Sequence, residues 1–216
     1  MTTRLFDALD SVGQALLAGL DTPFKIQAYL DSLPYIAEEL DRTPLQVMQA
    51  GQCHCLDGAL LAAAALHRLG FAPRLIDLRP DPGMDDDHVL AIYQIDGCYG
   101  AVAKSNYPGL RFREAVHRSL RELVITYFEG YFSIQNEKTL RAYTRPLNLT
   151  RFDALNWETN PAGTRRLIRH FYTLKSIPLI TPQAAARLSP MDERALAANL
   201  VGVNLAESFG NRPGTH

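Results

Sequence analysis

The stretch GQCHCLDGALLAAAALHRLG, residues 51–70, decides the fold, because a short polar start leads into a nearly uninterrupted apolar run that ends at a glycine. A helix that is apolar on nearly all sides is normally buried. Gly70 follows the last apolar residue and suits the left-handed conformation in which helices often end. The stretch therefore predicts a buried central helix over residues 55–69.

Cys55 lies in the first turn of this predicted helix. A thiol there is close to the positive end of the helix dipole and to unpaired backbone N–H groups, and both favour the thiolate. The same N–H groups can stabilise an oxyanion. Cys55 is therefore a candidate nucleophile, and Gln52 is a candidate oxyanion donor. The alternative is that Cys55 is only a small buried residue.

The hydrophobic period changes after the helix and predicts three short strands at 73–78, 88–95 and 98–105. Asp96-Gly97 separates the last two strands, and this dipeptide favours a two-residue hairpin turn. With these turn residues, His88 faces Ser105 across the hairpin. A small antiparallel sheet packed on the central helix predicts an α+β fold.

A histidine on such a sheet and a cysteine at the helix start have the relation that a Cys–His pair needs. His88 is therefore the candidate general base and acid. The group that orients its ring should come from the neighbouring strand, where Ser105 and the adjacent Asn106 are the candidates.

Residues 50–106 resemble the core of the transglutaminase-like (papain-like) cysteine enzymes. The shared positions are, in chain order, Cys55, Asp57, Leu69, Gly70, Pro73, Arg74, His88 and the Asp96-Gly97 turn. The resemblance implies a papain-like fold and acyl transfer or amide hydrolysis, with Cys55 as nucleophile and His88 as base. It implies no cofactor and a peptide or another amide as substrate, and it leaves hydrolysis and transfer both open.

The sequence departs from this family at the position of the orienting carboxylate. The family usually has an aspartate six residues after the turn glycine, and Ala103 stands there. Leu90 and Tyr99 stand where the family commonly has tryptophans. Ser105 or Asn106 would have to replace the aspartate. A transglutaminase-like fold that serves only as a binding or scaffold module is therefore the competing hypothesis.

A zinc site is the third hypothesis, because Cys53, Cys55 and His88 could supply ligands. The Cys-x-Cys spacing is shorter than that of most structural zinc sites, and no second Cys/His pair follows at a matching distance. We therefore expect no metal. Arg111 and Arg113, in the run KSNYPGLRFRE near the proposed site, are candidates for binding an acidic group of the substrate.

The flanks of this core are predicted to be helical. Thr22-Pro23 and Thr43-Pro44 are helix starts within residues 1–50, and Ser189-Pro190 is expected to open the last helix. The predicted organisation is one domain, with a helical part at 1–50, the transglutaminase-like core at 51–116 and a second helical part at 117–216.

Composition and charge bear on whether the protein binds nucleic acid or membranes and on its cellular compartment. The net charge is −1, so charge gives no argument for binding nucleic acid or an anionic membrane. No apolar run reaches the length of a membrane span. Three cysteines among 216 residues indicate a reducing compartment, and we expect the cytoplasm.

Overall fold

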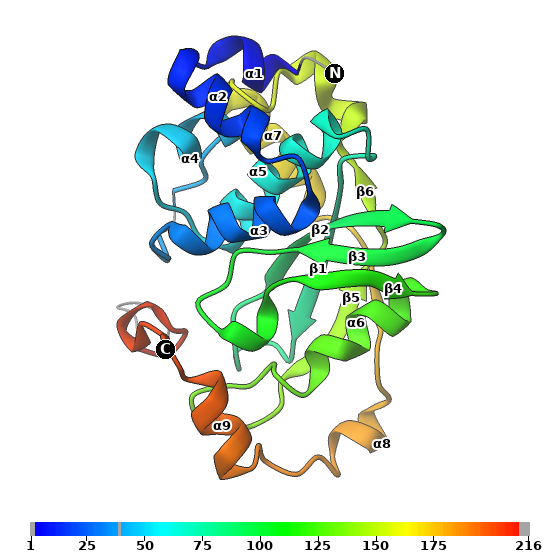
Figure 1. Cartoon of the computed structure of the whole chain (residues 1–216). Helices are drawn as coiled ribbons and strands as arrows, with labels where there is room; N and C mark the ends of the chain where they lie inside the picture. The colour runs from blue at the N-terminus through cyan, green and yellow to red at the C-terminus, as the bar shows by residue number, and fades with distance from the viewer. Residues whose placement is uncertain (1–2, 39, 212–216) are drawn as a thin grey trace.

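The computed structural model describes residues 3–38 and 40–211, and an antiparallel sheet with helices on both faces forms its centre (Figure 1). The order of the strands across the sheet is β4-β3-β2-β1-β5-β7, and β6 pairs with β1. The strands are β1 (Arg74–Pro80), β2 (His88–Ile95), β3 (Cys98–Val102), β4 (Arg113–His117), β5 (Leu140–Thr144), β6 (Leu147–Asn148) and β7 (Ser176–Pro178). The α+β class predicted from the sequence is confirmed.

The N-terminal part is helical, as predicted. Its helices are α1 (Arg4–Ala8), α2 (Ser11–Gly19), α3 (Pro23–Ser32) and α4 (Pro44–Ala50). Thr22 caps α3 by accepting a hydrogen bond from the backbone N–H of Lys25. Thr43 and Gln46 form a reciprocal capping box at the start of α4. Both predicted Thr-Pro helix starts are therefore confirmed.

The central helix α5 (Cys55–Arg68) is buried along its length, from Leu56 to Leu66. Its residues share one core with Val89, Ala91 and Val102 of the sheet and with the N-terminal helices. Gly70 has a φ of 92° and ends the helix in the left-handed conformation. The predicted central helix is thus confirmed, and it covers one face of the sheet.

The opposite face of the sheet is covered by α6 (Leu120–Phe128). Leu90, Ile92 and Ala101 pack in this second core, whereas their neighbours in sequence pack in the first. Because successive side chains of a strand point to opposite faces, β1, β2 and β3 contribute to both cores. Figure 1 shows the sheet between α5 above and α6 below.

The hairpin between β2 and β3 has the predicted turn. Asp96 and Gly97 have φ values of 51° and 79°, as a two-residue turn with two left-handed positions requires. The pairing runs from Ala91 opposite Val102 to Ile95 opposite Cys98, which is the predicted register. The strand β3 ends at Val102, three residues before the predicted end, so the predicted pairing of His88 with Ser105 lies beyond the ladder.

The prediction that residues 117–216 are helical is wrong in part, because β5, β6 and β7 lie in this range. Its helices are α6, α7 (Pro161–Phe171), α8 (Pro182–Ala185) and α9 (Glu193–Asn199). Asp192, rather than the Ser189-Pro190 pair, caps α9. Short 3-10 helices also join elements of the described chain: η1 (Pro108–Leu110), η2 (Leu149–Leu155) and η3 (Leu205–Glu207).

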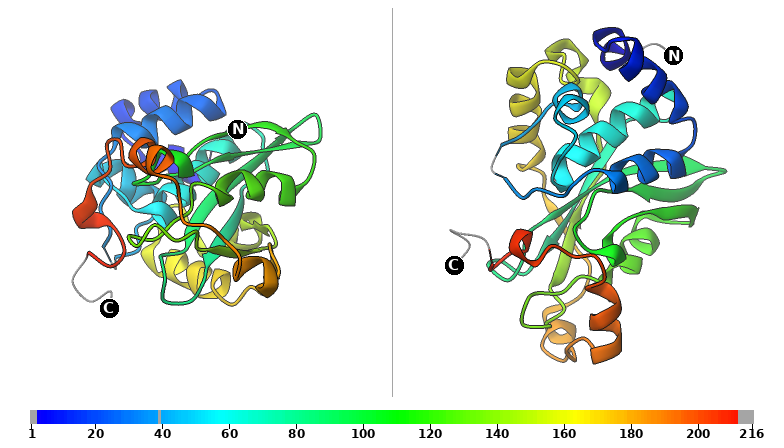
Figure 2. Two further views of the ribbon diagram at one scale, coloured as in Figure 1. Left: turned by 90° about the horizontal axis from the view of Figure 1, so that it is seen from below. Right: turned by 60° about the vertical axis from the view of Figure 1, so that its left-hand side comes forward.

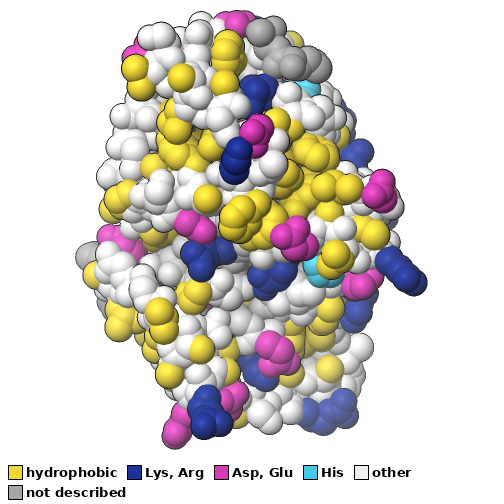
Figure 3. Space-filling view, in the orientation of Figure 1, with side chains coloured by type: hydrophobic (Ala, Val, Ile, Leu, Met, Phe, Trp, Pro, Cys, Tyr) yellow, Lys and Arg dark blue, Asp and Glu magenta, His cyan; other side chains and the backbone are white. Residues whose placement is uncertain are grey.

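An aromatic row links the first core to the surface. Phe71 packs on Tyr93, Tyr93 stacks on Phe112, and Phe112 meets the exposed ring of Phe24 on α3. On the face in Figure 3, hydrophobic side chains gather in the upper half, and charges of both signs are interspersed. No helix among the described residues is long and apolar enough to cross a membrane.

Candidate functional site

Cys55 is the first residue of α5, and its sulfur lies against the main chain of β2. The thiol donates a weak hydrogen bond to the carbonyl oxygen of Asp87 at 3.9 Å, and the sulfur accepts one from the backbone N–H of Val89. These two groups flank residue 88. The fold therefore brings the candidate nucleophile to the point on β2 where the candidate base is attached.

Desolvation favours the protonated form of the Cys55 thiol, although the residue as a whole is only partly buried. Desolvation raises the pKa of the thiol well above its ordinary value, and the nearby Asp87 carboxyl raises it further. The hydrogen bond from Val89 lowers the pKa only in part. The sequence predicts that the helix dipole favours the thiolate. The structure contradicts this prediction, because desolvation and a neighbouring carboxyl raise the pKa of the thiol.

His88 is 4% exposed, and its ring nitrogen Nε2 lies 2.7 Å from the carbonyl oxygen of Leu110. A carbonyl only accepts hydrogen bonds, so Nε2 carries the hydrogen and Nδ1 has the free lone pair. Burial lowers the pKa of His88 to about 4, the bond to Leu110 partly offsets this, and Arg113 lowers it further. The ring is therefore neutral at pH 7.

The His88 ring and the Cys55 sulfur approach β2 from different faces. Alternate residues of a strand point to the same face, so His88 points to the α6 side of the sheet, as Leu90 and Ile92 do. Its hydrogen-bond partner Leu110 also belongs to the core on the α6 side. The sulfur contacts the strand from the α5 side. In the described part of the chain, no hydrogen bond joins the sulfur to the ring.

The two residues expected to orient the His88 ring have other partners. The Ser105 hydroxyl oxygen accepts from the backbone N–H of Tyr107 at 3.0 Å, and the Asn106 side chain pairs with Asn204. The Leu110 carbonyl takes the orienting role instead. The sequence did not predict this partner, because every residue has a backbone carbonyl and only the path of the chain after β3 brings that of Leu110 to His88.

One pocket nevertheless gathers three of the predicted residues. His88, Ser105 and Asn106 all line it, together with Tyr131 and Phe209. Cys55 is not among its lining residues. The pocket opens on the His88 side of β2, so a substrate bound there would reach the histidine before the thiol.

The remaining predicted residues lie at the edge of this region. Gln52 donates to the Glu38 carboxylate at 3.4 Å. Arg111 forms an ion pair with Asp31 at 3.1 Å and lines a second pocket, which Ser105 and Asn106 also line.

Arg113 is held by the protein itself. Its guanidinium donates to the hydroxyl of Thr126 and lies 4.0 Å above the Tyr127 ring. It also donates to three backbone carbonyls, among them that of Gly109. This side chain has little capacity left for a substrate, so Arg111 is the better placed of the two arginines.

A buried carboxyl pair, which was not predicted from the sequence, lies beside Cys55. Asp77 on β1 is fully buried, accepts from Arg79 at 2.6 Å and shares a hydrogen bond with Asp87. Burial and the charge of Asp77 raise the pKa of Asp87 to about 7. Among the described residues, Oδ1 of Asp77 and Oδ2 of Asp87 are buried without a donor. The signal in the sequence was an aspartate at an inward position of an apolar strand, where an unpaired charge is costly.

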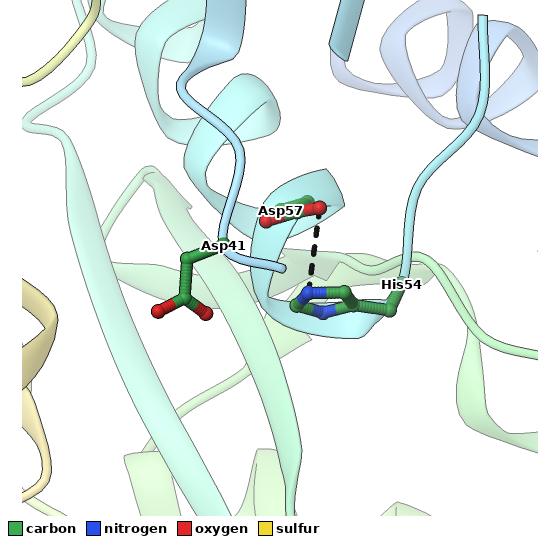
Figure 4. Close-up of side chains that lie close together, drawn as sticks. All are labelled: Asp41, His54 and Asp57. Carbon is green, nitrogen blue, oxygen red and sulfur yellow. Dashed lines mark ion pairs between the residues drawn. The ribbon is translucent and has the colours of Figure 1, made fainter. Parts of the chain in front are cut away.

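A second cluster, formed by Asp41, His54 and Asp57, could supply three ligands to a metal ion (Figure 4). The His54 ring lies 3.3 Å from Asp57, and burial raises the pKa of Asp57 to about 7. However, Arg42 lies 3.5 Å from the same carboxylate oxygen and already supplies positive charge. Ion pairs join Asp57 of α5 to Arg42 and His54, and Arg42 also pairs with Glu38.

The zinc site considered from the sequence consisted of Cys53, Cys55 and His88, which differ from the residues of this cluster. Among the described residues, the three-ligand cluster contains neither Cys53 nor Cys55 nor His88. Cys53 is fully buried, and burial raises the pKa of its thiol to about 12, which opposes the thiolate that zinc requires.

In comparisons with known proteins, no family model matches this chain, and no curated protein matches it in sequence.

Proposed function

We propose that the protein is a cysteine-dependent enzyme that transfers an acyl group or hydrolyses an amide, with Cys55 as nucleophile and His88 as base. One observation carries this proposal: the Cys55 sulfur lies on the main chain that flanks His88, at the start of a rigid buried helix. The resemblance of residues 50–106 to the transglutaminase-like core supports the same assignment. The substrate class is a peptide or another amide.

In the proposed reaction, Nδ1 of His88 takes the proton of the Cys55 thiol while the sulfur attacks the substrate carbonyl. A C–S bond forms, and backbone N–H groups of the first turn of α5 stabilise the oxyanion. The C–N bond then breaks, and His88 returns the proton to the departing amine. Water or a second amine attacks the thioester, the C–S bond breaks, and the proton returns to the sulfur.

The resting state in this proposal is uncharged. A protonated thiol and a neutral imidazole must exchange a proton during attack, in contrast to enzymes that store a thiolate–imidazolium pair. The two side chains also lie on different faces of β2. A change of rotamer alone does not carry a side chain across a strand, so the proposal includes a shift of the start of β2 that brings Nδ1 to the sulfur when the substrate binds.

The second candidate is a binding module without chemistry. The same two pKa shifts favour it, because they remove the charge on both members of the pair. Such a protein would use the pocket beside His88 to hold a ligand and would leave it intact.

A p-nitrophenyl ester, as a simple activated acyl donor, separates the two candidates. We expect an acyl group on Cys55, located by peptide mass spectrometry, and no acylation in the Cys55→Ala variant. Cys53→Ala is the matched control, since Cys53 is fully buried two residues away, and it should acylate as the wild type does.

His88→Gln should slow acylation by about 10²–10⁴-fold, the usual contribution of a general base. The rate should rise with pH through a pKa of about 4 as His88 loses its proton. Equal labelling of the wild type and the Cys55→Ala variant would reject the enzyme and leave the binding module.

A further inference from the structure

The last described segment of the chain returns to the pocket beside His88. Helix α9 is docked where the side chain of Asn199 fits over Gly109, at a spot that a Cβ atom on residue 109 would fill. From there the chain runs back toward the N-terminal helices, as the red segment shows in Figures 1 and 2. Glu207, Ser208 and Phe209 line the same pocket as His88.

The side chain of Asn106 forms hydrogen bonds with the backbone of this segment. Its side-chain Nδ2 donates to the carbonyl oxygen of Asn204 at 2.8 Å, and its Oδ1 accepts from the N–H of Asn204 at 3.0 Å. Both hydrogen bonds go to the backbone of one residue. This pairing requires no particular side chain at position 204, so a segment of another sequence could make it equally well if it is extended at this one residue, as Asn204 is before η3 begins.

Two further polar contacts fix the direction of the segment. The carboxylate of Glu207 accepts from the backbone N–H of Ala37 at 2.7 Å. The hydroxyl of Ser208 accepts from Nδ2 of Asn106 at 3.3 Å, and Ser208 is buried. The segment is therefore seated on the pocket by hydrogen bonds at three of its residues.

A similar pairing elsewhere in the fold differs from that of Asn106 and Asn204 in its exposure to solvent. Gln27 makes the same two hydrogen bonds with the backbone of Ala103, at 2.9 and 3.0 Å, and both residues are buried. By contrast, Asn204, Leu205 and Ala206 are exposed to solvent. Hydrogen bonds that are exposed to water, with few apolar contacts around them, open at low cost in free energy.

We infer that Asn106 and the pocket beside His88 form a binding site for a short polypeptide that is extended at one residue and then turns into a 3-10 helix, and that residues 204–209 of the same chain cover this site in the resting protein. Asn106 recognises the backbone, and the Ala37 N–H favours an acidic residue three positions later. The inference rests on the proposed function only in taking the bound polypeptide to be the substrate.

The test uses a fluorescent peptide with the sequence of residues 203–210, VNLAESFG, added to the full-length protein. The double variant Asn204→Pro and Glu207→Ala removes an N–H and a carboxylate that hold the segment. Faster hydrogen exchange at the Ala37 amide would show that the segment has been released. The side chain of Leu205 is exposed, so Leu205→Ala is the matched control within the segment.

We expect the peptide to bind the released variant at least about tenfold more tightly than the wild type, because the closed state masks the site. Adding Asn106→Ala should abolish this gain, and Leu205→Ala alone should not produce it. Equal binding to the wild type and the released variant, or no binding to a variant whose Ala37 amide exchanges fast, would overturn the inference. The assay has no chemical step. Binding by Cys55→Ala protein that cannot be acylated would therefore separate this inference from the proposed function.

Discussion

His88 is held in one tautomer and one protonation state by groups that are distant in the sequence. Its Nε2–H is fixed by a carbonyl of the loop that follows β3, and its pKa is lowered to about 4 because the surrounding core excludes water. The residue types at positions 55 and 88 could be singled out from the sequence. Their protonation could not, because it depends on which segments cover them.

The lowered pKa of His88 predicts a specific pH dependence of stability. Between pH 6.5 and 4 the unfolded chain takes up a proton that the folded chain excludes, so the folded state loses stability as the pH falls. The full effect is about 3 kcal/mol. Urea unfolding should show this loss in the wild type relative to His88→Gln.

NMR gives an independent measurement of the same group. The imidazole signals of His88, assigned by their absence in the His88→Gln variant, should titrate near pH 4 and show the hydrogen on Nε2 at pH 7. A titration near pH 6.5 would contradict the burial described for this ring.

At the scale of elements, α5 is positioned by a glycine as well as by its apolar surface. A Cβ atom on Gly58 would lie 2.4 Å from the Cβ of Lys104. The Lys104 ammonium in turn donates to the carbonyl oxygens of Leu30 and Leu33 at the end of α3. Residue 58 is thus a point of close contact between α5 and the segment that follows β3, and Lys104 links that segment to α3.

Gly58→Ala should therefore destabilise the protein by about 1–3 kcal/mol, although alanine has the higher helix propensity. Thermal unfolding with circular dichroism measures the loss. Gly19→Ala in α2 is the control, because nothing lies within 4 Å of its added Cβ. The control should leave the stability unchanged or raise it by up to about 1 kcal/mol. If both variants were equally stable, the close approach of α5 to residue 104 would be refuted.

The elements differ in how well the sequence predicted them. The hairpin at 88–102 was predicted with its turn and register, because the Asp96-Gly97 dipeptide acts locally. The strands β5, β6 and β7 were missed, because they are short and are stabilised by pairing with β1 and with one another across long sequence separations. The carboxyl pair of Asp77 and Asp87 was missed for the same reason, since the turn that follows β1 carries Asp87 back beside Asp77.

At the scale of the whole molecule, one sheet serves two cores. Trp157 is 1% exposed in the core on the α5 side, and Tyr127 is fully buried in the core on the α6 side. Strands β1, β2 and β3 contribute alternate side chains to both. Neither core can lose its packing without disturbing the strands that form the other.

The shared sheet predicts a single cooperative unfolding transition. Fluorescence of Trp157, the only tryptophan, should report the same urea midpoint as hydrogen exchange at Leu123 and Val124 in α6. Val203→Pro with Asn204→Pro in the C-terminal segment is a suitable control, because local release of that segment should leave both midpoints unchanged. Two separate midpoints would show that the cores unfold independently.

The tip of the β2–β3 hairpin projects from the body of the molecule, away from the C-terminal segment (Figure 1). Ile95, Asp96 and Gly97 are all exposed there. Exposed loop tips are the sites that best tolerate inserted sequence. An affinity tag inserted at this turn would therefore anchor the protein to a surface by one point, leaving both ends of the chain free for single-molecule measurements of how the C-terminal segment opens and closes.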